Sequence, residues 1–412
     1  MNRSLFSRAR SVGALGLCAV LSCLSVVMAA PLYTVTNLVT NDQGAHPAQI
    51  TDPGLKNAWG LSYSPTGPFW VSSNGTGTVD LYSVNPSTQL TNQVGLVVSI
   101  PGTGSVTGQV FNSGAAAAAF NGDVFLFTSE DGTVSGWRGG LGTSAETLVP
   151  ASAANIYKGA ALGTVAGSSY LYAANFRAGS IDVLKGSALA PALSGAFADP
   201  NLPAGYAPFN VQNLGGILYV SYAAQDASQQ DEMAGAGLGI VNRFDLNGNL
   251  IGRVATAGSL NAPWGLAIAP SSFGDLAGAL LVGNFGDGRI SAFNPLDDSY
   301  LGQILDASNQ PLSIDGLWAL SPGNDGSAGS SQWLYFTAGP EGESDGLFGV
   351  LTAVPEPDTY GLMLLAFIAL LGTMARRRRR KNKYPSPDEA IYDRRRPEQT
   401  PPDRPVDEPR DD

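Results

Sequence analysis

Asn57-Ala58-Trp59-Gly60-Leu61 is the stretch that decides the fold, because the chain repeats it. It returns as Ala262-Pro263-Trp264-Gly265-Leu266 and, more weakly, as Gly316-Leu317-Trp318-Ala319-Leu320. Each copy is followed by a run of β-branched and aromatic residues that ends in a Gly or Asn turn, a pattern typical of a β-strand. The repetition therefore predicts a domain assembled from similar β-units.

Six copies of this unit fill the middle of the chain, with a period of about 45–55 residues. The second strand of each unit is expected within 69–77, 124–132, 171–176, 218–222, 280–288 and 333–339. The third strand is expected at 79–82, 134–137, 181–184, 240–244, 290–293 and 347–350. In an all-β chain this period predicts a six-bladed β-propeller with four-stranded blades, and a pair of β-sandwiches or a solenoid is the alternative.

The last copy lacks one strand after Val350. The unassigned strand Tyr33–Val39 is expected to pair into this blade, because closing the ring removes a free sheet edge. The propeller domain is thus predicted to cover residues 30–353.

The composition of the 412-residue chain agrees with a large folded β-domain. Hydrophobic residues make up 44% and charged residues 14%, which argues against disorder, and the 51 Gly and 27 Pro favour many short strands over a helical bundle. Between Pro31 and Asp358 there are 25 acidic and 8 basic residues, a net charge of −17. A domain this acidic repels the phosphate backbone of nucleic acids, so nucleic-acid binding is not expected.

Two residue types limit the possible chemistry. Cys18 and Cys23 lie in the N-terminal apolar stretch, so the processed chain is expected to hold no disulfide, zinc-thiolate site or cysteine nucleophile. His46 is the only histidine, which excludes a Ser-His-Asp triad and a multi-histidine metal site. No catalytic residue is assigned.

The N-terminus has the pattern of a secretory signal peptide. Arg3, Arg8 and Arg10 precede an apolar run over 12–27, and small residues follow at the expected cleavage site, Ala29 and Ala30. Residues 1–29 are therefore predicted to direct export and to be removed. A lipoprotein box at 20–23 is the alternative.

The C-terminus is predicted to carry a membrane helix. Residues 359–375 are uncharged and are followed at once by Arg376, Arg377, Arg378, Arg379 and Arg380. Such a basic block stays in the cytoplasm, so the segment is expected to cross the inner membrane with the propeller outside. A buried core helix is the alternative.

The sorting signal is recognised from the residues before that helix, Val354, Pro355, Glu356 and Pro357. With the apolar segment and the arginines, region 354–380 resembles the PEP-CTERM sorting signal of Gram-negative bacteria. The resemblance implies recognition by an exosortase-type protease, an inner-membrane intermediate, and final placement at the cell surface or outside the cell. Residues 381–412, rich in Pro, Arg and Asp, follow as an expected disordered cytoplasmic tail.

The body also resembles known proteins over residues 33–352. It is similar to NHL-like six-bladed propellers and to a group of exported proteins that begin with a strand like Tyr33–Val39. This resemblance implies the fold and an envelope setting, and it implies no activity.

A ligand site is expected at one mouth of the central channel. Asn57, Lys158, Asn210 and Asp315 stand just before first strands and are predicted to line it. Six-bladed lactonases hold a channel ion, and oxygen ligands of this type would suit Ca²⁺. The alternative is that these groups satisfy turns and channel water, and no cofactor is the primary expectation.

Four further features have structural interpretations. Trp59, Trp264 and Trp318 are expected to pack as blade repeats, and a sugar-stacking platform is the alternative. Asp245–Asn249 is predicted to be a hairpin turn. The insertion Gln225–Ala236 is expected to project from one mouth, either as a partner or ligand loop or as a solvated loop. The acidic turn with Glu341, Glu343 and Asp345 is either a weak cation site or solvated surface.

Two functions are consistent with these features. The first is an exported binding module, linked to a matrix polysaccharide or an envelope protein. The second is a Ca²⁺-dependent hydrolase or lactonase that uses the channel. The lack of histidines favours the binder, because the usual general base near neutral pH is missing.

Overall fold

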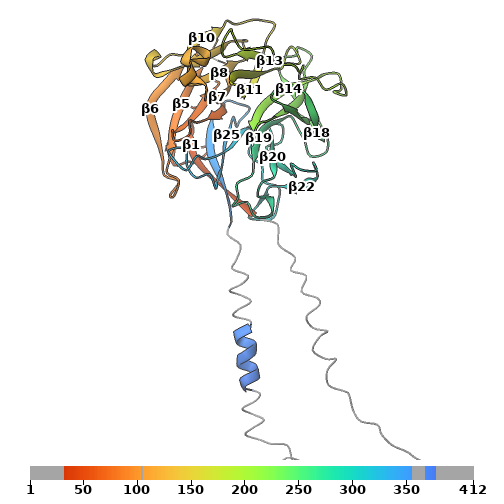
Figure 1. Ribbon diagram of the computed structural model, residues 1–412. Coiled ribbons are helices and arrows are strands. Elements are labelled where there is room, and N and C mark those ends of the chain that lie inside the picture. Colours follow the sequence, from red (N-terminus) through yellow and green to blue (C-terminus); the bar gives the residue numbers. More distant parts are fainter. Residues whose placement is uncertain (1–31, 104, 355–366, 377–412) are drawn as a thin grey trace, which may run out of the picture. The chain divides into compact units, whose positions relative to one another are not determined.

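The computed structural model describes residues 32–103, 105–354 and 367–376. Its strands form six mainly antiparallel sheets arranged as the blades of a β-propeller (Figure 1). The predicted fold is therefore confirmed. In the first blade β3 (Ala58–Ser62), β4 (Phe69–Ser73), β5 (Thr78–Val84) and β6 (Thr91–Ser99) pair in chain order.

The next four blades follow the same order. The second contains β7 (Val106–Phe111), β8 (Phe125–Ser129), β9 (Val134–Trp137) and β10 (Glu146–Val149). The third contains β11 (Tyr157–Val165), β12 (Ser168–Asn175) and β13 (Ser180–Lys185). The fourth contains β14 (Tyr206–Leu214), β15 (Ile217–Gln225), β17 (Ile240–Asp245) and β18 (Leu250–Thr256), with the short β16 (Glu232–Met233) beside β15. The fifth contains β19 (Pro263–Ile268), β20 (Leu280–Asn284), β21 (Ile290–Phe293) and β22 (Tyr300–Gln303).

The sixth blade is completed by the N-terminal strand, as predicted. β24 (Leu317–Pro322), β25 (Leu334–Ala338) and β26 (Leu347–Ala353) are followed in the sheet by β1 (Leu32–Thr40). β1 runs antiparallel to β26, with Thr36 opposite Val350. The short strands β2 (Ile50–Thr51) and β23 (Leu305–Asp306) then pair with β1 and cover its outer side.

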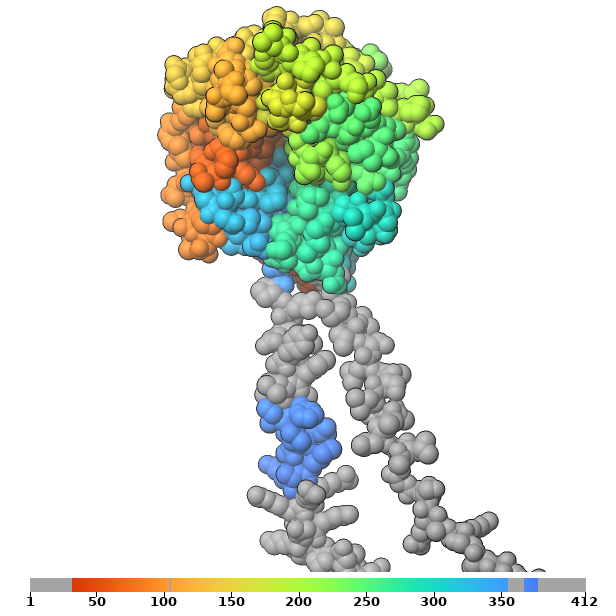
Figure 2. Space-filling model, in the orientation of Figure 1, coloured from red at the N-terminus to blue at the C-terminus, as the bar shows by residue number. Residues whose placement is uncertain are grey.

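The ring is closed. Each of the inner strands β3, β7, β11, β14, β19 and β24 contacts the inner strands of both neighbouring blades, and β24 contacts β3. In Figure 2 the blue atoms of the sixth blade accordingly lie between the orange first blade and the teal fifth blade. The alternatives of paired sandwiches or a solenoid are wrong, because neither brings the last blade against the first.

The third blade differs from the expected four-stranded pattern. After β13 no fourth strand forms in the described part of this blade, and residues 186–205 run as a loop. Pro191, Pro200 and Pro203 lack the N–H that a strand ladder needs. The loop instead bonds to the next blade, where Gly195 and Phe197 donate to the carbonyls of Asn247 and Gly248.

That neighbouring turn is the predicted hairpin at Asp245–Asn249, which joins β17 to β18. The Asp245 carboxylate accepts from the amides of Asn247 and Asn249, each at 2.9 Å. Gly248 has φ +90°, a conformation that side chains disfavour. The hairpin interpretation is confirmed.

The described residues 367–376 are helical, and 367–375 fall within the predicted membrane segment 359–375. Within the parts of the chain that the structure describes, no helix has the length and apolar character needed to cross a membrane. The other residues of the 359–375 segment, the cleavage site at Ala29 and Ala30, and the sorting residues 355–357 and 377–380 lie outside the described residues.

Candidate functional site

One β-bulge recurs in the inner strand of every blade. Where each inner strand pairs with the second strand, the register skips one or two residues. The first residues skipped in the six blades are Trp59, Thr107, Lys158, Phe209, Trp264 and Trp318. All six are buried, so equivalent positions supply the side chains at the centre of the ring.

Four of these residues form an aromatic plug, defined as Trp59, Phe209, Trp264 and Trp318. Trp59 stacks on Trp318 with ring centroids 3.6 Å apart, and Trp264 meets Trp318 edge-on at 5.8 Å. Phe209 packs on the same Trp318 ring at 5.8 Å. The packing interpretation of the three tryptophans is thus confirmed. Because these rings fill the axis, a ligand has to approach from a mouth of the propeller.

Close backbone approach permits this tight centre. A Cβ atom on Gly60 would stand 2.3 Å from the Thr107 carbonyl oxygen, and one on Gly159 would stand 2.2 Å from the Asn210 Oδ1. Glycine is therefore required where inner strands of adjacent blades touch. The glycine after Trp59, Thr107, Lys158 and Trp264 is the sequence mark of this contact.

Lys158 is the cationic exception among the six central residues. Its side chain is 2% exposed, and its Nζ lies 5.2 Å from the centroid of the Trp59 ring, where a cation is attracted to the aromatic face. Nζ donates to Glu130 Oε1 at 2.5 Å and to Asp231 Oδ1 at 3.2 Å, and Glu232 Oε2 lies at 4.0 Å. A buried ammonium group is thus neutralised by carboxylates from other blades.

Asn57 links one more carboxylate, that of Glu343, to Lys158 and its partners. Its Nδ2 donates to Glu343 Oε2 at 2.6 Å, while its Oδ1 accepts from Trp318 Nε1 at 2.9 Å. We call the set Lys158, Glu130, Asp231, Glu232, Glu343 and Asn57 the axial cluster. It joins the first, second, third, fourth and sixth blades above the aromatic plug.

Burial and charge determine the protonation of the axial cluster. Burial alone would lower the pKa of Lys158, but the negative charges of Glu130 and Glu232 outweigh it and hold this pKa above its ordinary value. Burial raises the pKa of Glu232 to about 7, and the nearby Lys158 offsets only part of that rise. Burial likewise raises the pKa of Glu343, against the opposing charge of Lys158. Lys158 is therefore charged at neutral pH, whereas the pKa of Glu232 lies close to neutral pH.

This protonation predicts a pH-dependent stability that Glu232→Gln removes. The pKa of Glu232 is higher in the folded protein than its ordinary 4.5, so its contribution is fully present below pH 4.5 and is lost as the pH rises through 7. The shift corresponds to about 3 kcal/mol. Urea unfolding at pH 5 and pH 8 should show a smaller drop in the free energy of unfolding for Glu232→Gln than for wild type. The exposed control Glu341→Gln should keep the wild-type drop, and an unchanged drop in Glu232→Gln would contradict this assignment.

The four residues predicted to line the channel do not form one ring. Asn57 and Lys158 meet in the axial cluster. Asn210 is buried in β14, where its Nδ2 donates to the Trp264 carbonyl at 2.8 Å and its Oδ1 accepts from the amide of Val211. Asp315 is exposed and accepts from the amide of Glu341 at 3.0 Å. Ligand binding by any of the four stays a prediction.

The site contains carboxylates that sequence reasoning did not connect with Lys158. Glu130 follows β8, Asp231 and Glu232 come from the insertion Gln225–Ala236, and Glu343 comes from the predicted acidic turn. The available signal was Lys158 itself, because a lysine inside an apolar inner strand requires carboxylate partners. Its partners stand 28 and 73 residues away along the chain, and no local pattern identifies them.

These residues do not fit the expected Ca²⁺ ring. Two of the four predicted positions lie away from the axial cluster. Within it, Glu130, Asp231 and Glu232 lie within 4.0 Å of Lys158 Nζ, and Glu343 accepts from Asn57. Among the described residues there is no group of three or more His, Cys, Asp or Glu side chains arranged to hold a metal ion.

Comparison with known proteins identifies one short motif and a set of relatives. Residues 353–380 match the PEP-CTERM protein-sorting motif. The chain is 31% identical over 354 residues to the uncharacterised protein R648 of Acanthamoeba polyphaga mimivirus, covering 82% of this chain and 84% of that protein. It is 29% identical over 317 residues to the uncharacterised protein L690 of the same virus, covering 73% and 81%.

The solved structures that match this chain have low sequence identity to it. A streptogramin B lyase is 12% identical with a TM-score of 0.42, covering 78% of this chain and 97% of its own. An aldose sugar dehydrogenase from Streptomyces coelicolor is 16% identical with a TM-score of 0.44, covering 79% of this chain and 100% of its own.

Proposed function

The chain belongs to the family of the mimivirus protein R648, and we propose that it is an exported binding module whose ligand face is the mouth around the axial cluster. The PEP-CTERM motif at 353–380 and the propeller fold support an exported protein that an exosortase-type sorting system recognises. The motif also implies sorting at the membrane of a Gram-negative bacterium.

The route of export is part of this proposal. Residues 1–29 act as the signal peptide, with cleavage at Ala29 or Ala30, and 359–375 hold the chain in the inner membrane until sorting. The propeller then remains at the cell surface or is released. The basic block from Arg376 to Arg380 supports this orientation, because arginines next to a membrane segment stay in the cytoplasm.

The observation that carries the proposal is the charge of the mouth around the axial cluster. The turns between second and third strands and the connections between blades meet there. The acidic residues of these turns and connections include Asp42, Asp52, Glu130, Asp131, Asp226, Asp231, Glu232, Asp287, Asp315, Glu341, Glu343 and Asp345. Their cationic residues are Lys56, Lys158, Arg177 and Arg289. Carboxylates in excess around one opening create a negative potential that attracts cationic ligands.

The opposite mouth differs because arginines neutralise two of its carboxylates. Asp123 pairs with Arg138 at 2.7 Å and Asp298 pairs with Arg243 at 2.7 Å. With these two pairs neutralised, the opposite mouth carries a smaller excess of carboxylates than the mouth that holds the axial cluster.

A polysaccharide with free amino groups suits this face. Its repeated positive charges would meet carboxylates from several blades at once, and multiple weak contacts add up on one chain. A polyanionic polysaccharide would be repelled by the same field. We infer that the exported propeller binds an amine-bearing component of the matrix.

Co-sedimentation of the full chain with polysaccharides tests the proposal. The chain should sediment with chitosan, which carries free amines, more than with the neutral chitin or the acidic alginate, and added salt should release it. The triple variant Asp287→Asn/Asp315→Asn/Glu341→Gln should bind chitosan about tenfold more weakly, a loss of about 1.4 kcal/mol. The matched control Asp275→Asn/Asp297→Asn/Asp325→Asn removes three carboxylates from the opposite mouth and should bind as wild type does. The proposal would be refuted if the two triple variants lost chitosan binding equally, or if the wild-type chain bound chitosan no better than chitin or alginate.

A hydrolase is the second candidate, and one observation favours it. The raised pKa of Glu232, about 7, suits a general base near neutral pH and could replace the missing histidine. Ca²⁺ does not fit the predicted channel ring, so a Ca²⁺-dependent lactonase would need other ligands. Chelator-sensitive turnover of esters or lactones would support a metal enzyme. Turnover that survives chelators and is lost in Glu232→Gln would support a carboxylate base.

A further inference from the structure

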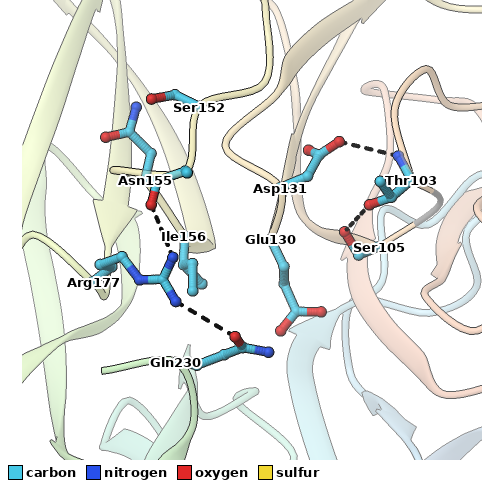
Figure 3. Close-up of a pocket in the computed structure, with 10 residues that line it drawn as sticks. Thr103, Ser105, Glu130, Asp131, Ser152, Asn155, Ile156, Arg177 and Gln230 are labelled. Carbon is cyan, nitrogen blue, oxygen red and sulfur yellow. Dashed lines mark hydrogen bonds between the residues drawn. The ribbon is translucent and has the colours of Figure 1, made fainter. Parts of the chain in front are cut away.

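A polar cavity lies beside the axial cluster at the same mouth. Its volume is about 380 Å³, and its lining includes Glu130, Asp131, Asn155, Arg177 and Gln230 (Figure 3). These residues come from the second blade, the third blade and the insertion of the fourth blade. The space lies within the range of small-molecule sites, and because a water molecule takes up about 30 Å³, it would hold a ligand the size of an amino acid or short peptide.

Arg177 forms one wall of this cavity. Its Nη1 donates to the Ala153 carbonyl at 2.8 Å and its Nη2 donates to Gln230 Oε1 at 3.4 Å. Figure 3 shows the guanidinium group directed toward the space between it and Glu130. Within the described residues Arg177 forms no salt bridge. Its two neutral acceptors fix the guanidinium and leave its charge and further N–H donors for an anionic group.

Asp131 and Glu130 stand on the opposite wall (Figure 3). Asp131 Oδ2 accepts from the amide of Thr103 at 3.0 Å, and its Oδ1 accepts from the amide of Thr133 at 2.9 Å. Glu130 is neutralised by Lys158, whereas Asp131 has no cationic partner in the part of the chain that the structure describes. The two backbone amides therefore hold in place a carboxylate whose charge is not neutralised.

We propose that this cavity binds a small zwitterion of the amino acid or short-peptide class. The ligand's carboxylate pairs with Arg177, which suits a carboxylate because its N–H groups form a planar fork. The ligand's ammonium group faces Asp131 and Glu130. The inference rests on the binding role proposed for this mouth and adds a second, smaller ligand to it.

The charges of the two walls disfavour other ligand classes. A metal cation would meet Arg177, and an inorganic anion would meet Asp131 and Glu130. A neutral sugar would leave both charges without a partner, and a desolvated charge without a partner is costly. Only a ligand with both a negative and a positive group can pair with the cationic wall and the anionic wall at once.

Calorimetric titration of the full chain with three matched probes tests the inference. L-Glutamine carries both charges, N-acetyl-L-glutamine lacks the cation, and L-glutaminamide lacks the carboxylate. L-Glutamine is expected to bind, and each blocked probe should bind at least about tenfold more weakly. Arg177→Gln should weaken L-glutamine by a similar factor. The control Arg289→Gln makes the same change at an exposed position of the same mouth and should leave the affinity unchanged.

The outcomes separate this inference from the proposed function. If L-glutamine fails to bind, or binds Arg177→Gln as it binds wild type, the zwitterion site is refuted even where chitosan is still retained. If L-glutamine binds as expected and chitosan is not retained, the proposed function fails and the site stands. Should Arg177→Gln not fold, Arg177→Lys keeps the charge but loses the planar fork, and it should still bind L-glutamine more weakly than wild type does.

Discussion

Lys158→Met should lower the free energy of unfolding by about 3–5 kcal/mol at pH 8, the usual cost of removing one partner from a buried ion pair. Methionine fills nearly the same space, so the loss reports the charge and not a cavity. Without the ammonium group, Glu232 and Glu130 lose their counter-charge next to the aromatic plug. Urea unfolding followed by tryptophan fluorescence measures the change, because the plug contains three of the six tryptophans.

The pH dependence of the loss identifies its cause. At pH 5 Glu232 is protonated, so less uncompensated charge remains and Lys158→Met should cost less than at pH 8. Lys185→Met removes an exposed lysine and should change stability by less than about 0.5 kcal/mol. A cost that is the same at both pH values would contradict the role of Lys158 as counter-ion.

A disulfide between Thr34→Cys and Thr352→Cys should stabilise the propeller by about 5–6 kcal/mol on the chain-entropy scale, because it closes a very long loop. The two threonines face each other across the β1–β26 pair, with their Oγ1 atoms 3.1 Å apart although they are 318 positions apart in the chain. The domain has no cysteine of its own, so the new pair has no competing partner. Unfolding with and without reductant measures the gain.

The matched control for the closure moves one cysteine by one residue. In Val35→Cys/Thr352→Cys the first side chain points to the other face of the sheet, since neighbours in a strand alternate. That pair should stay reduced and give no stabilisation. Cross-linking of the control pair, or none in Thr34→Cys/Thr352→Cys, would show that the strand register is different.

The sequence was sufficient to predict the fold where the signal is local and repeated. Six strand pairs at a regular period implied six blades, and a last copy that lacks one strand implied that Tyr33–Val39 would close the ring. Burial of Trp59, Trp264 and Trp318 followed from their equivalent places in the repeat. The missing fourth strand of the third blade did not follow, because it depends on bonds between its loop and the turn at Asn247 and Gly248.

The site was predicted only in part, because the bulges change which residues of different blades occupy equivalent positions. The sequence suggests that three polar residues near first strands occupy equivalent places in their blades, namely Asn57, Lys158 and Asn210. In the structure the residues at equivalent bulge positions are Trp59, Lys158 and Phe209. A bulge shifts one residue toward the axis, and this shift has no composition signal of its own. The partners of Lys158 come from turns of other blades and emerge only once the ring has closed.

Chemical coupling of an amine-bearing sugar to the carboxylates tests the central claim, that the mouth around the axial cluster is the ligand face. Chitosan oligomers would be bound to the full chain and coupled with a carbodiimide, and the modified residues mapped by mass spectrometry against free glucosamine as the reference. Coupling should be enriched at Asp231, Asp315 and Glu341 and should stay at the reference level at Asp275, Asp297 and Asp325. Enrichment at the second group, or the same pattern as free glucosamine, would contradict the account.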